Sequence, residues 1–236
     1  MILLALSLGA YLFALWKRNI IYAAIILQAA YITWRGAGLG RLPLVGPHDT
    51  VVFMTASIAA FSLPFLSLIK QKDRFISAVS VMASLFTVFS LVYKPHDFPL
   101  PPVLQTIWFE LHVVLAFMSY ALFAIAFILG GLYLKDREPE YEVLQYRAIL
   151  IGYCLFTLSM IFGGIWAYLA WGTYWIWTPK ELWTSILWIY YSFFLHARLI
   201  KWWSGKPSAY LSIAGFIIVM FTYLGVSLLM KSSHSF

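Results

Sequence analysis

The sequence predicts an all-α protein, a polytopic membrane bundle of about eight transmembrane helices. Of its 236 residues, 63% are hydrophobic and only 11% are charged, whereas a soluble domain carries about 25% charged residues. The apolar residues are also gathered in long runs, as membrane spans of about 20 residues require. We therefore expect a single membrane domain over residues 1–236.

The apolar runs give the expected spans in chain order. They cover about residues 1–16, 19–34, 50–69, 75–93, 109–134, 148–170, 183–200 and 208–230. The first two are short, so we expect them to be tilted or lengthened by flanking residues. Lys17 and Arg18 follow the first run, whereas the positive charges of a signal peptide precede it. The first run is therefore expected to remain as a span with its N-terminus outside.

The basic residues predict the orientation of these spans. With the N-terminus outside, eleven of the sixteen Lys and Arg residues fall in the segments 17–18, 70–74, 135–147 and 198–206. Such an excess marks short cytoplasmic loops, so both termini are expected outside. These loops also account for the net charge of +7, which therefore does not indicate a nucleic-acid partner. Residues 135–147, which carry charges of both signs, are expected to form an interfacial connector.

A tryptophan-rich stretch follows the sixth apolar run. Within thirteen residues it holds four tryptophans and a tyrosine, which are Trp171, Tyr174, Trp175, Trp177 and Trp183. Gly172 and Pro179 interrupt any helix through it. Trp and Tyr gather at membrane interfaces as anchors, but this many rings at this spacing favours a surface for a flat partner.

The end of this stretch has the signature of a helix start. Thr178 stands at the N-cap, Pro179 at the first helical position and Glu181 at the third. This is a capping box, in which Thr178 and Glu181 each accept a hydrogen bond from a backbone N–H.

These residues carry a resemblance to a known family. The pattern GxxWAxxAWGxYWxWxPKExWxxxxW, residues 163–188, is similar to the WWD motif of the CcsA/ResC cytochrome c assembly family, whose members handle haem. The resemblance implies a haem-handling loop over residues 166–188. It implies that haem b is contacted by Trp171, Gly172, Tyr174, Trp175, Trp177, Thr178, Lys180, Glu181 and Trp183. The family has Asp where this chain has Thr178, a change that keeps the cap and removes one negative charge.

Three histidines lie in further family-like patterns. His112 lies in LPPxLQxxWxxxHVxxAxxxYxxF and His234 in GVxLLxxxxHS. The resemblance implies that these two are the external ligands of haem iron. His196, in LHxR, is implied to belong to a second, intramembrane haem site, whose other ligand comes from a CcsB-like partner subunit. Without the resemblance, a histidine in a span is a helix–helix hydrogen-bond partner and a histidine near a C-terminus is a tail residue.

The remaining histidines and the cysteine carry weaker signals. His48 and His96 each precede an Asp in an outer loop and are expected to be solvated, and Asp49 falls at a possible helix start. Cys154 is the single cysteine, so it excludes an intrachain disulfide, and we expect it to be a packing residue. The sequence has no CxxCH, so the chain is not itself a c-type cytochrome.

The resemblance implies two alternative functions. The first is the haem-handling subunit of a cytochrome c synthase (haem lyase), which transports haem and presents it at the outer membrane face for thioether attachment to the CxxCH of apocytochrome c. The second is a haem-binding or regulatory protein of HemX type, or a haem delivery subunit like CcmC, without synthase activity. Whether the chain is an enzyme is thus left open. Either function implies contact with lipid of a bacterial-type inner (cytoplasmic) membrane or of a thylakoid membrane.

Overall fold

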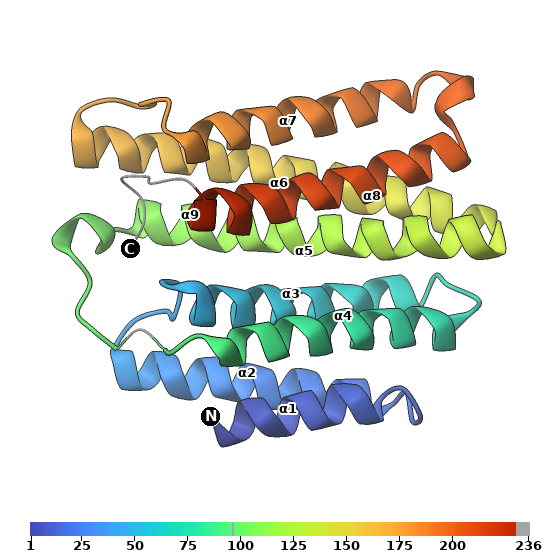
Figure 1. Ribbon diagram of the computed structural model, residues 1–236, viewed down its shortest axis with the longest axis horizontal. Coiled ribbons are helices and arrows are strands. Elements are labelled where there is room, and N and C mark those ends of the chain that lie inside the picture. Colours follow the sequence, from blue (N-terminus) through green and yellow to red (C-terminus); the bar gives the residue numbers. More distant parts are fainter. Residues whose placement is uncertain (96, 230–236) are drawn as a thin grey trace. The chain divides into compact units, whose positions relative to one another are not determined.

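A computed structural model describes residues 1–95 and 97–229 (Figure 1). Every regular element within these residues is a helix, so the expected all-α class is confirmed. The chain divides into two compact units, Met1–Pro99 and Leu100–Phe236, which are described one at a time. The single domain over residues 1–236 stays a prediction.

Six helices of the described chain are long and apolar enough to cross a membrane. They are α2 (Ile20–Leu39), α3 (Pro47–Leu66), α4 (Lys72–Val92), α5 (Ile107–Asp136), α6 (Pro139–Trp171) and α8 (Lys206–Met220) extended by the π-helical turn η3 (Phe221–Gly225). These helices support a multi-pass membrane protein.

Two of the eight expected spans are not among the six. Helix α1 (Ile2–Phe13) has only 12 residues, which is too few for a span. Helix α7 (Pro179–Ala197) has 19 residues. Its polar and charged side chains and its tryptophans and tyrosines give it a lower mean hydropathy than the six. Three short elements complete the described chain, namely η1 (Pro102–Leu104), η2 (Lys201–Trp203) and α9 (Val226–Leu229).

In the first unit, the four helices α1 to α4 form a closed ring of neighbours. Helix α1 packs against α2 and α4, and α3 packs against the same two helices. The interior contains polar groups that pair with one another. The Tyr11 hydroxyl donates to Gln28 Oε1 at 2.5 Å, and Gln28 Nε2 donates to the Val52 carbonyl at 3.2 Å. These buried groups are therefore satisfied without water.

His48 is buried in the first turn of α3, so the expectation of a solvated loop histidine is wrong. Its Nδ1 lies 2.8 Å from the Ser90 carbonyl oxygen, and its Nε2 lies 2.7 Å from the Tyr31 hydroxyl. Because a carbonyl can only accept, Nδ1 carries the proton and Tyr31 donates to Nε2. The helix start at Pro47 turns this side chain inward, where both ring nitrogens find partners. His96 lies outside the described residues.

Asp49 also lies in the first turn of α3, as its expected place at a helix start implies. Its carboxylate forms a two-pronged ion pair with Arg35 of α2, with Nε–Oδ1 at 2.5 Å and Nη2–Oδ2 at 2.9 Å. Arg35 is only 9% exposed and also donates to Asp97 at 2.8 Å. The pair therefore fixes the end of α2 against the start of α3.

In the second unit, α5 and α6 pair along much of their length, and α7 and α8 complete the ring (Figure 1). Helix α5 contacts α6 and α8, and α7 contacts the same two helices. The rings of Phe123 on α5 and Tyr191 on α7 stack at 3.7 Å with 10° between their planes. Both side chains are fully buried, so this stack fills the space between two helices of the ring.

Two expectations about α6 are wrong. Residues 139–147 form its first turns, so most of the expected connector 135–147 is helical. Pro139 at the first helical position, with Glu140 and Glu142 in the first turn, explains this start, because acidic residues are favoured at a helix N-terminus. Cys154 is exposed on α6, so it is not a packing residue in the interior of the unit.

Candidate functional site

The tryptophan-rich stretch passes from α6 through a short non-helical segment into α7. Helix α6 ends at Trp171, and Gly172 caps it with φ 73°, a left-handed conformation that favours glycine. Helix α7 begins at Pro179. The helix breaks expected at these two residues are confirmed. Only residues 172–178 of the expected loop 166–188 lie outside helices, and we call them the Trp segment.

The expected capping box is present at the start of α7. Thr178 Oγ1 accepts from the Glu181 N–H at 3.3 Å, and Glu181 Oε2 accepts from the Thr178 N–H at 2.8 Å. The same Oε2 atom also accepts from the Ile176 N–H at 3.1 Å. The Glu181 carboxylate therefore binds two amides of the Trp segment and fixes its approach to α7.

The Trp segment presents aromatic rings at the surface of the unit. Tyr174 is 60% exposed and stacks on Tyr168 of α6, with ring centroids 4.6 Å apart. Trp177 is 68% exposed and lies edge-on to Trp175 at 6.4 Å. The backbone of Trp177 has φ 61°, a left-handed conformation that costs a non-glycine residue roughly 1–3 kcal/mol. The fixed backbone on either side of Trp177 holds it there.

His112 lies in the second turn of α5 and is bound to α6 through Ser159. His112 Nδ1 lies 2.9 Å from the Ser159 carbonyl oxygen, so this nitrogen carries the proton. The Ser159 hydroxyl donates to the His112 carbonyl at 2.8 Å. Nε2 then keeps its lone pair, and no partner for it is found in the described part of the chain. Metal-binding histidines commonly have this arrangement, because a donor bond from one nitrogen orients the other as a ligand.

The approach of His112 to α6 requires a glycine. A Cβ atom on Gly163 would lie 2.6 Å from His112 Nδ1. One helical turn away, the ring of Trp166 is nearly parallel to the imidazole, with an interplanar angle of 14° and a centroid distance of 6.5 Å. Trp166 Nε1 donates to the Val103 carbonyl of η1 at 2.7 Å, and its ring contacts Trp171 at 4.9 Å. A row of rings therefore leads from His112 to the start of the Trp segment.

Sequence reasoning did not single out Ser159 and Gly163 as partners of His112. Ser159 and Gly163 are small residues four apart on an apolar helix, and this spacing predicts that another helix can approach closely. The spacing does not predict that the approaching residue is His112 of α5.

The other expected site residues lie on α7. The Trp183 ring packs on Phe221 of η3 at 4.5 Å, and Lys180 lies partly buried in the first turn. His196 is exposed, and its Nδ1 bonds to the Ser192 carbonyl of the same helix at 2.8 Å. Eighteen residues of helix, or about 27 Å, separate His196 from Thr178, so the structure does not bring His196 to the Trp segment. His234 lies outside the described residues.

The fold and this site define a multi-pass helical membrane protein with a histidine and aromatic rings beside a Trp-rich segment. The chain belongs to the cytochrome c assembly protein family, whose model matches residues 45–234. The match includes His112, the Trp segment and α7, which confirms the resemblance drawn from the sequence.

Individual relatives agree with this assignment. The chain is 33% identical to the cytochrome c biogenesis protein CcsA of Guillardia theta, over 91% of this chain and 84% of the relative. It is 31% identical to CcsA of Chlamydomonas reinhardtii, over 90% of this chain and 65% of that relative, just under two thirds of its length. It is 30% identical to CcsA of Prochlorococcus marinus (strain AS9601), over 89% of this chain and 81% of that relative.

A solved structure shares the fold. The cytochrome c haem lyase CcmF matches with a TM-score of 0.69 over 93% of this chain, at 16% sequence identity. The chain spans 44% of the length of CcmF. At this identity the match shows the fold alone.

Proposed function

We propose that the protein acts in cytochrome c maturation as the haem-handling subunit of a cytochrome c synthase. Membership of the cytochrome c assembly family and the CcsA relatives support this role. The single observation that carries it is the state of His112, whose Nδ1–H is bound by the Ser159 carbonyl while Nε2 is left as a ligand. The Trp segment lies next to it through Trp166 and Trp171.

In this proposal His112 Nε2 and His234 would hold the haem iron at the outer membrane face. Neutral imidazole is a common protein ligand of haem iron. The rings of Trp171, Tyr174, Trp175 and Trp177 pack against the haem edge. Gly172, Thr178 and Glu181 hold the backbone that carries these rings, Lys180 pairs with a propionate, and Trp183 anchors α7 on Phe221.

The chain's contribution to the reaction is then positioning. Each thioether forms when a cysteine S–H of the apocytochrome CxxCH adds across a haem vinyl group, so a C–S and a C–H bond replace the S–H bond and the C=C π bond. Nothing is oxidised or reduced in this addition. Rigid aromatic side chains that hold the vinyl edge still reduce the entropy that the addition must lose.

His196 belongs to a second, inner haem site in this proposal. Its exposure at the far end of α7, with Nδ1 bound within its own helix, leaves Nε2 available to a ligand shared with another chain. A CcsB-like partner subunit would supply the other histidine of this site. This arrangement predicts that haem at the inner site is retained only when the partner is present.

One observation favours a second candidate function. Thr178 completes the capping box without the carboxylate that the family carries at this position. A haem-binding or regulatory protein of HemX type would keep the fold and the haem site without attaching haem, and so would not need that carboxylate. The two functions differ in the product, because only the synthase gives covalently bound haem.

Expression with a CcsB-like partner and a CxxCH reporter cytochrome, in a host that lacks its own assembly system, tests the proposal. The synthase function predicts reporter haem that stays bound after denaturation, and loss of this signal in His112→Ala. Haem that copurifies with the chain, with no attachment to the reporter, would support the regulatory function. A chain that acquires no haem in any combination would contradict both.

A further inference from the structure

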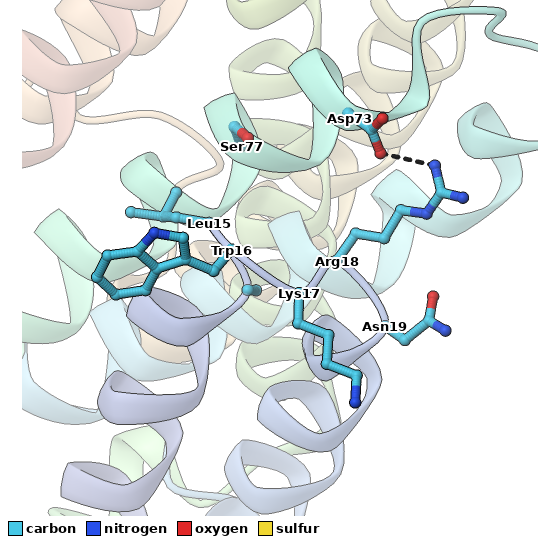
Figure 2. A pocket seen from close by; sticks show the side chains of 8 residues that line it. Leu15, Trp16, Lys17, Arg18, Asn19, Asp73 and Ser77 are labelled. Atoms are coloured by element: carbon cyan, nitrogen blue, oxygen red, sulfur yellow. Dashed lines mark hydrogen bonds and ion pairs between the residues drawn. The ribbon is translucent and has the colours of Figure 1, made fainter.

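A cavity of about 340 Å³ lies in the first unit, remote in sequence from the Trp segment (Figure 2). It is lined by the turn between α1 and α2, residues 14–19, and by Asp73 and Ser77 of α4. Its volume is at the small end of ligand sites, which measure roughly 300–1,000 Å³. It therefore suits a small polar group better than a large flat cofactor.

This end of the unit carries a strong positive charge. Its basic residues are Lys17, Arg18, Lys70, Lys72 and Arg74, and Asp73 is the acidic residue among them. The charge pattern of the whole chain predicts that these residues lie at the cytoplasmic face, where membranes carry anionic lipids. The local excess of positive charge selects an anion as the ligand.

Two cations of the cavity lining are available for such a ligand. Arg18 Nη1 reaches Asp73 Oδ1 at 2.6 Å, but the two side chains are 53% and 78% exposed. An ion pair this exposed contributes little to stability, so Arg18 can turn to a bound anion at little cost. Lys17 extends away from Asp73 (Figure 2) and has no ion-pair partner in residues 1–95 or 97–229.

An apolar surface adjoins these cations. Trp16 is 86% exposed beside Lys17, and Leu12, Phe13 and Leu15 of the same segment are also exposed. Exposed tryptophan beside basic residues is typical of the membrane interface. Free phosphate would need only the charged cavity, whereas a lipid also uses an exposed apolar flank for its acyl chains.

We propose that this cavity binds the headgroup phosphate of an anionic phospholipid, with Lys17 and Arg18 as its cations and Trp16 beside the acyl chains. The site is independent of the haem-handling role. A lipid held here would fix α1, which is too short to span a bilayer alone, at the membrane interface.

Native mass spectrometry of the full chain in detergent tests this proposal. The protein is given equal amounts of phosphatidylglycerol and phosphatidylcholine with identical acyl chains. We expect preferential retention of one phosphatidylglycerol, weakened roughly 25-fold in Lys17→Gln/Arg18→Gln, because each basic residue near anionic lipid contributes about a fivefold factor. Asp73→Asn removes the competing carboxylate and should strengthen retention. Lys201→Gln/Lys206→Gln removes the same charge from the second unit and should leave retention unchanged.

Three results would overturn the proposal. Equal retention of the two lipids would mean that the site does not select an anionic headgroup. Equal loss in the two double variants would mean that only net charge attracts the lipid. Release of phosphatidylglycerol by an excess of inorganic phosphate would identify free phosphate, not lipid, as the ligand.

Discussion

The Ser159 carbonyl binds the Nδ1–H of His112 at 2.9 Å, and the Ser159 hydroxyl returns a hydrogen bond to the His112 carbonyl at 2.8 Å. This double connection joins α5 and α6 at one level and fixes the imidazole in one tautomer. Because both connections use groups that only a close helix approach can bring together, they depend on the absence of a side chain at Gly163. The contribution of Gly163 to the position of His112 can therefore be tested by substitution, as can the role of His112 itself.

Gly163→Ala should displace His112 from Ser159. The added Cβ would lie 2.6 Å from Nδ1, and overpacking of this kind costs about 1–3 kcal/mol. We expect a lower thermal midpoint and weaker haem retention. Gly131→Ala is the matched control, because a Cβ at Gly131 on α5 meets nothing within 4 Å. Equal behaviour of the two variants in thermal melts and haem titrations would contradict the role given to Gly163.

Glu181→Ala should loosen the Trp segment. The carboxylate accepts from the N–H groups of Ile176 and Thr178, and hydrogen bonds to charged groups contribute about 1.5–3 kcal/mol each. We expect faster hydrogen exchange at these two amides. Glu181→Gln keeps one acceptor oxygen and should give an intermediate rate. Unchanged exchange in the alanine variant would show that other contacts hold the segment.

Substitutions of Thr178 distinguish helix capping from a direct role of a carboxylate at this position. Thr178→Ala should cost about 1 kcal/mol of local stability, and Thr178→Asp almost nothing, because both side chains cap well. We expect the aspartate variant to bind haem as the wild type does. A change in haem affinity well beyond tenfold, or about 1.4 kcal/mol, would be too large for a cap and would assign the carboxylate a direct role.

The charge distribution predicts that the C-terminus lies outside and that the turn between α5 and α6 lies in the cytoplasm. A reporter that is active only outside the cytoplasm, fused after Phe236, should be active, and the same reporter placed between Arg137 and Glu138, in the turn between α5 and α6, should be silent. The opposite pattern would reverse the orientation and would place the Trp segment on the cytoplasmic side.

The local features of the site could be predicted from the sequence. Gly172, Pro179 and the capping box of Thr178 and Glu181 act over four residues or fewer, so propensity and spacing are enough to place them. The bond from Glu181 to Ile176 was not foreseen, because it depends on how the segment folds back before α7. The hydropathy pattern also did not indicate the first turns of α6, because charged residues lower the mean hydropathy there, although Pro139 marks a helix start.

Contacts between distant residues could not be predicted. His48 is buried because Tyr31 and Ser90, from two other helices, satisfy its ring nitrogens. His112 depends in the same way on Ser159, 47 residues further along the chain. A single sequence gives the apolar faces of helices but not which faces meet, so the partner of each histidine came only with the structure.

The visible spectrum of the purified protein, oxidised and reduced, tests the central claim most directly. If His112 Nε2 holds the iron, wild type reconstituted with haem should give the low-spin spectrum of bis-histidine haem. His112→Ala should lose most of this haem at the outer site, and added imidazole should partly restore the spectrum by filling the vacant position. Since His234 is the proposed second ligand, His112→Ala/His234→Ala should retain still less haem than His112→Ala. An unchanged low-spin spectrum in His112→Ala/His234→Ala would contradict the account, because the iron would then be held elsewhere.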